Sequence, residues 1–119
     1  MTERTALVVD DQSINRLLAC TLLQRLGWQV QEADSGEKAL ELADKNRYQL
    51  ILMDISMPGM SGEEACEKLR QRPDIQAKIV AYTAHAQSED YDKFLSLGFD
   101  DVLIKPLSRQ RLEEVASSC

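Results

Sequence analysis

The chain has 119 residues, of which 44% are hydrophobic and 29% are charged. This length and balance are typical of one globular, soluble domain over residues 1–119 rather than of a disordered chain. The net charge of −6, from 14 basic and 20 acidic residues, argues against nucleic-acid binding, which needs a basic face. No apolar run approaches the length of a membrane span and no secretory leader opens the chain, so we expect no membrane contact.

The cysteines, Cys20, Cys66 and Cys119, are odd in number and show no paired metal-ligand spacing. A disulfide framework and a zinc site are therefore poor interpretations, and we expect a cytoplasmic protein in a reducing compartment. The last predicted helix is short and ends near Cys119, which favours a piece excised from a longer protein.

Short apolar segments alternate with amphipathic segments along the chain. The predicted strands are residues 5–9, 28–33, 50–53, 78–82 and 101–104. The predicted helices are residues 13–26, 34–46, 62–72, 87–97 and 108–117. Strands and helices that alternate with short connections indicate an α/β fold, in which five helices cover both faces of a five-stranded parallel sheet.

The first predicted strand, residues 5–9, leads directly into Asp10 and Asp11. Adjacent carboxylates repel one another, and a divalent cation such as Mg²⁺ (or Mn²⁺), which prefers oxygen ligands, would relieve that repulsion. The alternative is that both are exposed carboxylates, one of which caps the helix that begins near Ser13.

The helix at residues 13–26 carries two groups of apolar side chains. The larger group follows the helical period of about 100° per residue and is expected to face the sheet. Its members are Leu18, Ala19, Leu22, Leu23 and Leu26. Ile14 and Leu17 lie off that side, near the helix start. They are either scattered surface side chains or a docking patch for a helix of a partner, beside the acidic pair.

The strand at residues 50–53 is apolar throughout, the pattern of a strand buried on both faces. It delivers Asp54 to a loop rich in turn-forming residues, at the carboxyl edge where open α/β sheets bind their ligands. Taken alone, Asp54 is better explained as a helix cap or the start of a turn. A functional role for Asp54 is favoured because polar side chains suited to the same site follow three other predicted strands.

Two later strands also lead into polar residues. The strand at residues 78–82 is followed by Thr83, whose hydroxyl suits a phosphoryl oxygen, although threonine is also a common strand residue. The strand at residues 101–104 is followed by Lys105, whose ammonium can neutralise a bound anion, although it can also be an ordinary surface lysine. A cis bond to Pro106 would aim this lysine inward.

In such a sheet the ends of the first, third, fourth and fifth strands meet at one edge. The side chains expected to converge there are Asp10, Asp11, Asp54, Thr83 and Lys105. In this set of three carboxylates and a lysine, the carboxylates can hold one divalent cation, which shields an incoming phosphoryl group, and leave a carboxylate oxygen as nucleophile. Attack by an aspartate on phosphorus forms an acyl phosphate.

In order and spacing, this set resembles the receiver domains of two-component response regulators, and the resemblance covers essentially the whole chain. The matching segments are Val9-Asp10-Asp11, Met53-Asp54-Ile55-Ser56-Met57-Pro58-Gly59-Met60-Ser61-Gly62, Thr83-Ala84 and Lys105-Pro106. The resemblance implies the flavodoxin-like receiver fold with strand order 2-1-3-4-5. It also implies that Asp54 is a phosphoacceptor.

The resemblance further implies a magnesium site around Asp54. Asp11 would bind the ion directly and Asp10 largely through water. The backbone carbonyl of Ser56 would be a further ligand.

On the phosphoryl side, the resemblance implies contacts from Thr83 and Lys105, with a cis bond between Lys105 and Pro106. In the family, side chains two residues after the phosphoacceptor and two after the threonine flank the route of the hydrolytic water. Here these are Ser56 and His85, so both are expected to modulate dephosphorylation, although a lone loop histidine can also be a bystander.

Asn15-Arg16 and Thr83-Ala84-His85-Ala86 resemble receivers of hybrid histidine kinases or multistep phosphorelays. Such receivers take a phosphoryl group from a histidine kinase and often pass it to a histidine phosphotransfer domain. Ile14 and Leu17 would suit either partner, because both partners present helices. Val102 stands where the family often carries an aromatic switch residue, which favours phosphotransfer over strong conformational switching.

Three other classes compete with this interpretation. A phosphatase of the haloacid dehalogenase type needs a second aspartate two residues after the first, where this chain has Ser56. A flavodoxin-like flavin binder needs a hydroxyl- and glycine-rich phosphate loop after the first strand, where Asp10 and Asp11 would repel the phosphate. A phosphorylation-independent interaction module stays open as the third class, with the complete acidic set against it.

Overall fold

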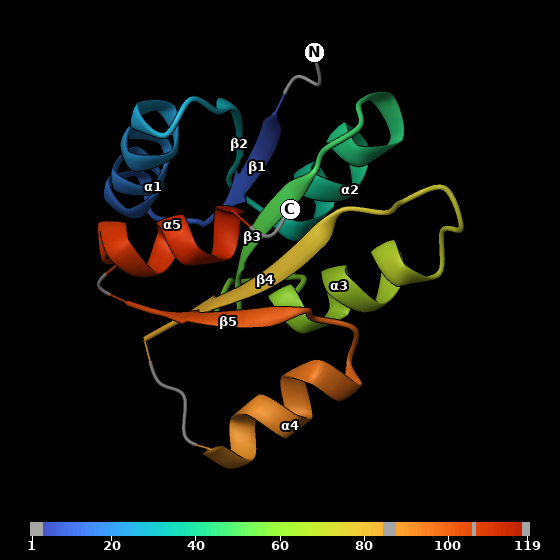
Figure 1. Ribbon diagram of the computed structural model, residues 1–119. Helices are drawn as coiled ribbons and strands as arrows, with labels where there is room; N and C mark the ends of the chain where they lie inside the picture. Colours follow the sequence, from blue (N-terminus) through green and yellow to red (C-terminus); the bar gives the residue numbers. More distant parts are fainter. Residues whose placement is uncertain (1–3, 85–87, 106, 118–119) are drawn as a thin grey trace.

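The strands of the chain form a single parallel sheet in the order β2-β1-β3-β4-β5 (Figure 1). The computed structural model describes residues 4–84, 88–105 and 107–117. The strands are β1 (Thr5–Val9), β2 (Gln29–Ala33), β3 (Leu50–Asp54), β4 (Lys78–Thr83) and β5 (Asp101–Ile104). The predicted α/β fold and its strand order are confirmed. β3 and β4 each run one residue further than predicted, into Asp54 and Thr83, and β2 begins one residue later.

The helices form two layers, one on each face of the sheet (Figure 1). They are α1 (Ser13–Arg25), α2 (Gly36–Lys45), α3 (Gly62–Arg70), α4 (Ser88–Ser96) and α5 (Arg109–Ser117). α1 and α5 pack on one face, while α2, α3 and α4 contribute to the core on the other. No helix in the described ranges is both long and apolar enough to span a bilayer.

The central strand β3 explains the unbroken apolar run of the sequence. All five of its residues are buried, because β1 and β4 flank it and a helical layer covers each of its faces. Leu50 and Leu52 face the layer of α1 and α5, whereas Ile51 and Met53 face the opposite layer. β2, at the sheet edge, exposes most of its residues and accordingly has the polar sequence that an edge strand tolerates.

On α1 the buried side chains are Ala19, Cys20 and Leu23. The prediction that Leu18 faces the sheet is wrong, because 40% of this residue is exposed. Cys20 packs with Leu23 in the core, which rotates the buried stripe away from Leu18. Leu18 therefore belongs to the outward-facing surface that also carries Ile14 and Leu17.

The loop after β3 folds back tightly onto that strand. A Cβ atom at Gly62 would lie 2.0 Å from the carbonyl oxygen of Asp54, so only glycine fits at the first residue of α3. Ser61 caps this helix by accepting a hydrogen bond from the backbone N–H of Glu64 at 3.2 Å. The alternative in which Asp54 caps the helix is therefore not what the structure contains.

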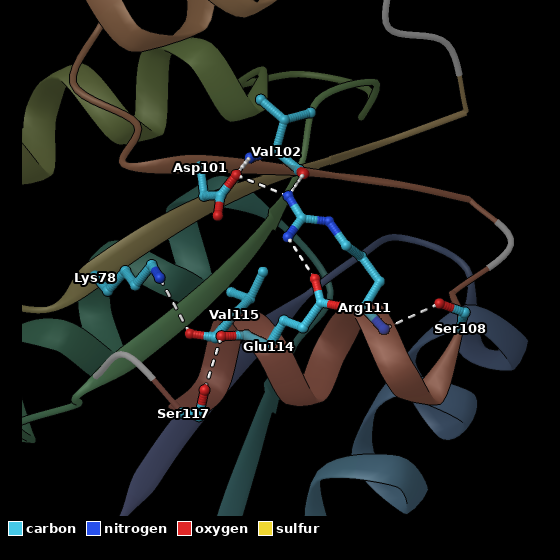
Figure 2. A network of polar contacts seen from close by, with 8 residues as sticks. All are labelled: Lys78, Asp101, Val102, Ser108, Arg111, Glu114, Val115 and Ser117. Atoms are coloured by element: carbon cyan, nitrogen blue, oxygen red, sulfur yellow. Dashed lines mark hydrogen bonds and ion pairs between the residues drawn. The ribbon is translucent and has the colours of Figure 1, made fainter.

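A polar network ties α5 to β4 and β5 (Figure 2). The guanidinium of Arg111 donates to Oδ1 of Asp101 at 3.1 Å and to the carbonyl of Val102 at 3.3 Å. From β4, the Lys78 ammonium donates to the carbonyl of Val115 at 3.0 Å. The Arg111 contacts tie together β5 and α5, the elements on either side of Lys105 in the chain.

Candidate functional site

Three carboxylates gather at the carboxyl edge of the sheet. One oxygen from each of Asp10, Asp11 and Asp54 lies within 4.8 Å of the other two. Asp10 follows β1 and Asp54 ends β3, and these two strands are neighbours in the sheet, so the convergence follows directly from the strand order. The structure thus confirms the predicted clustering of the three acidic side chains.

Asp54 lies at the bottom of this cluster and is only 3% exposed. Its Oδ1 accepts hydrogen bonds from the Ser56 backbone N–H at 3.3 Å and from the Lys105 ammonium at 3.1 Å. Burial, and then the charge of Asp10, raise the pKa of Asp54 to about 6, against the opposing effect of Lys105. In the absence of a bound cation, the site therefore disfavours a second negative charge.

Asp10 is completely buried, and its two oxygens have different surroundings. Oδ1 accepts a hydrogen bond from the backbone N–H of Gln12 at 2.9 Å. Oδ2 lies 3.2 Å from the Lys105 ammonium but accepts no hydrogen bond from the described residues. Gln12 is the N-cap of α1 and makes no side-chain capping bond, so the capping interpretation of the acidic pair fails.

The acidic cluster fits a hard divalent cation. Oδ2 of Asp10 is buried and accepts no hydrogen bond from the described residues, and the Lys105 ammonium 3.2 Å away is shared with Asp54. Asp11 is exposed at the rim of the cluster, where a carboxylate can bind an ion that keeps part of its water shell. The backbone of Ser56 lies beside Asp54, as its N–H bond to that carboxylate shows.

Lys105 contacts both buried carboxylates and is itself largely enclosed. Its ammonium pairs with Asp54 at 3.1 Å and with Asp10 at 3.2 Å, and its side chain is 19% exposed. It also lies 4.7 Å from the ring centroid of Tyr82, a cation–π contact that sequence reasoning missed. The position of Tyr82, directly before Thr83 at the end of a buried strand, was the available signal.

A second residue that sequence reasoning left without a role is Arg16. Its guanidinium donates to the backbone carbonyl of Asp10 at 2.7 Å and pairs with Glu32 at 3.2 Å. It thereby joins the start of α1 to the end of β1. Arg16 lies six residues after Asp10 and in the first turn of α1, and this position was the signal for the contact.

Thr83 is 8% exposed at the end of β4, and its carbonyl accepts the Lys105 backbone N–H at 2.8 Å. The structure therefore brings Thr83 to the same sheet edge as the carboxylates. His85 and Pro106 lie outside the described residues. Val102 is fully buried in β5, where it pairs with Ala81.

The predicted docking residues lie on α1, the helix that begins just after the acidic pair. Ile14 is 79% exposed and Leu17 is 66% exposed, and Leu18 adds to them on the same side. We call these three side chains the α1 patch. They are large apolar groups on a helix face that the rest of the described chain leaves uncovered.

Comparisons with known proteins agree with this geometry. The family described as the response regulator receiver domain matches residues 6–117. The chain is 40% identical over 112 residues to the signal transduction histidine-protein kinase BarA of Escherichia coli, a match that covers 93% of this chain. The same match spans only 12% of the length of BarA.

Solved structures give the same result. The chemotaxis protein CheY4 of Vibrio cholerae superposes with a TM-score of 0.92 at 27% identity, over 98% of each chain. The receiver domain of the sensor histidine kinase PA1611 of Pseudomonas aeruginosa gives a TM-score of 0.89 at 30% identity, over 98% of this chain and 97% of that one. A magnesium ion is coordinated in the active-site cleft of that receiver. From its fold, its acidic edge and the match over residues 6–117, the chain belongs to the response regulator receiver domains.

Proposed function

We propose that residues 1–119 act as one phosphoacceptor receiver domain in a two-component or phosphorelay system. An oxygen of Asp54 bonds to the phosphorus of a phosphohistidine while the P–N bond breaks, and the bonding electrons return to the imidazole nitrogen. The observation that carries the proposal is the placement of Asp54. It is a buried carboxylate, 3.1 Å from an ammonium and clustered with two further carboxylates.

Lys105 and Thr83 would receive the phosphoryl group on Asp54. The Lys105 ammonium already contacts the Asp54 carboxylate, so a short movement brings it to an oxygen of the acyl phosphate. Thr83 ends the neighbouring strand and offers a hydroxyl to a second phosphoryl oxygen. Both groups stabilise negative charge that increases at the phosphoryl oxygens during transfer.

A magnesium or manganese ion would be held by the carboxylates of Asp10, Asp11 and Asp54, with the backbone carbonyl of Ser56 as a further ligand. The Oδ2 of Asp10, which accepts no hydrogen bond from the described residues, and the magnesium in the PA1611 receiver support this assignment. When bound, such an ion offsets negative charge on the incoming phosphoryl group. The chain's own part is to keep three oxygen donors together on adjacent strand ends.

A histidine kinase, a histidine phosphotransfer domain, or both would be the partner, with onward transfer from Asp54 to the phosphotransfer domain. The α1 patch supports this, because it puts exposed apolar area next to the acidic cluster. A helical partner that covers Ile14 and Leu17 would bring its histidine close to Asp54. We place this exchange in the cytoplasm, without nucleic-acid or membrane contact by the domain.

Ser56 and His85 would set the lifetime of the acyl phosphate through access of water to Asp54. Ser56 is small and exposed, and so leaves room for water. Val102 is an aliphatic residue fully buried in β5, which supports a domain that transfers phosphate rather than one that switches strongly.

The test is the intact mass of the protein after incubation with Mg²⁺ and a small acyl-phosphate donor. The wild type is expected to gain one phosphoryl group, and Asp54→Asn is expected to gain none. Asp74→Asn, which alters an exposed carboxylate in the α3–β4 connection, is the matched control and should react like the wild type. A wild type that gains nothing from this donor or from a phosphohistidine partner would favour the phosphorylation-independent interaction module.

A further inference from the structure

We infer that Tyr82 is a positioning residue for Lys105, whose ammonium it holds over the acidic cluster through the face of its ring. The inference rests on the proposed function, because it assigns Tyr82 a part in presenting Lys105 to the phosphoryl group. It starts from the distance of 4.7 Å between the ammonium and the ring centroid, within the range of about 6 Å for a cation–π contact.

The sheet register explains why this ring lies beneath this lysine. Tyr82 pairs with Asp54 of β3 on one side and with Leu103 of β5 on the other. Paired residues in a parallel sheet point to the same face, so Asp54, Tyr82 and Leu103 form one cross-strand row. Lys105 follows Leu103 by two residues and therefore points to the same face, diagonally across from Tyr82.

The ring is a fixed surface. Tyr82 is 1% exposed and packs in the core layer of α1 and α5, so its ring has little freedom to turn away. Burial, followed by the charges of Asp10 and Asp54, raises the pKa of Tyr82 to about 12. The phenol is neutral at physiological pH, and the ammonium of Lys105 lies over the face of the ring.

The lysine needs such a support because its two carboxylate partners have a second role. In the proposed function Asp10 and Asp54 bind a divalent cation, which repels the ammonium of Lys105 from the same oxygens. A ring face attracts an ammonium without using a carboxylate oxygen. Lys105 can then stay beside Asp54 while the carboxylates turn toward the cation. A leucine at position 82 would fill the core but would give the ammonium no such attraction.

The experiment compares Tyr82→Phe, which keeps the ring, with Tyr82→Leu, which removes it. Phe94→Leu is the matched control, because Phe94 is a buried aromatic residue in the opposite core layer. The first readout is the NMR shift of the Lys105 ε-methylene protons in lysine-labelled protein, assigned through their loss in Lys105→Arg. The second readout is the initial rate of Asp54 phosphorylation with Mg²⁺ and a subsaturating small donor. Circular dichroism checks that each variant is folded at the assay temperature.

The wild type and Tyr82→Phe are expected to show the upfield ring-current shift and the same rate. Tyr82→Leu is expected to lose the shift and to react about five-fold more slowly, because it lacks one cation–π contact. Phe94→Leu should change neither readout. A Tyr82→Leu rate equal to that of the wild type, an equal loss in Phe94→Leu, or a wild type without the ring-current shift would overturn the inference.

The outcome also separates this inference from the proposed function. A wild type that takes no phosphoryl group contradicts the proposed function, whatever the variants do. The NMR shift then decides the positioning of Lys105 alone: retention in Tyr82→Phe with loss in Tyr82→Leu supports it, and any other pattern overturns it.

Discussion

The ammonium of Lys105 lies 3.1 Å from Oδ1 of Asp54, although 51 positions separate the two residues in the chain. The strand order β3-β4-β5 leaves only one strand between them. The same ammonium also faces Asp10, so one positive charge serves two buried carboxylates, while Asp11 adds a third negative charge at the rim. Without a divalent cation the site carries excess negative charge, and this imbalance makes the effect of single substitutions on stability predictable in sign.

Asp54→Asn is expected to stabilise the metal-free protein by about 2 kcal/mol, because it removes a buried negative charge beside Asp10. An asparagine oxygen can still accept the hydrogen bond from the Ser56 N–H. Urea unfolding in the presence of a chelator gives the free energy of unfolding. Asp11→Asn is the control and should have a much smaller effect, since Asp11 is exposed. A less stable Asp54→Asn would contradict the charge imbalance.

Lys105→Ala should change the free energy of unfolding in the opposite direction from Asp54→Asn. It leaves Asp10 and Asp54 without their shared cation and is expected to destabilise the metal-free protein by about 3 kcal/mol. The loss should be smaller in an Asp54→Asn background, where only one carboxylate remains uncompensated. Urea unfolding of the four proteins forms a double-mutant cycle, and purely additive effects would show that the pair does not interact.

Magnesium is expected to raise the free energy of unfolding of the wild type, by about 2.7 kcal/mol when its concentration is one hundred times the dissociation constant. Asp11→Asn should lose most of this gain, because it removes one of the three clustered carboxylates. Asp74→Asn should keep the whole gain. Thermal unfolding against Mg²⁺ concentration measures all three, and an unchanged gain in Asp11→Asn would remove that residue from the metal site.

The double variant Ile14→Ala, Leu17→Ala is expected to slow transfer from a phosphohistidine partner about ten-fold, through the apolar contact area it loses. Its rate with a small donor should not change, because the substitutions leave the acidic cluster intact. Leu95→Ala on α4, where the leucine is 49% exposed, is the control for loss of an exposed apolar side chain. Partner transfer at the wild-type rate would exclude the α1 patch as the docking surface.

The two buried thiols are expected to make the protein less stable at alkaline pH. Burial raises the pKa of Cys20 to about 11 and that of Cys66 to about 12. Thiols of an unfolded chain lose their proton near pH 8.5. Between that pH and the folded pKa values the folded protein keeps protons that the unfolded chain has released, so stability falls as pH rises.

The free energy of unfolding at pH 10 should be lower than at pH 8 by about 2 kcal/mol for each thiol. Urea unfolding at the two pH values measures it. The same comparison in a Cys20→Ala, Cys66→Ala variant isolates the thiols from the tyrosines and lysines, which also titrate in this range. A variant that loses as much stability as the wild type would contradict the raised thiol pKa values.

The sequence was sufficient to predict the sheet and the acidic edge, because both depend on patterns that are local in the chain. An apolar run followed by a carboxylate identifies β3 and Asp54 together, and alternating elements imply parallel strands whose ends converge. The same logic brought Lys105 to the site, since it follows a strand directly.

What the sequence did not reveal depends on contacts across elements. Leu18 was expected in the core because its spacing suits a helix face, and only the packing of Cys20 shows where the buried stripe lies. Tyr82 and Arg16 act through a diagonal strand contact and a guanidinium-to-carbonyl bond. Both contacts depend on the register between strands and on the path of the loop, and the positions of Tyr82 and Arg16 along the chain are only a weak signal of them.

The two helical layers each contain one buried thiol, Cys20 with α1 and Cys66 with α3. Because the sheet separates the layers, the rate at which each thiol is alkylated in native buffer reports the local opening of its own layer. With Cys119 replaced by serine, a partner bound to α1 would slow the alkylation of Cys20 and leave the alkylation rate of Cys66 unchanged. The alkylation rates of these two cysteines therefore distinguish a local docking event on α1 from a stabilisation of the whole fold.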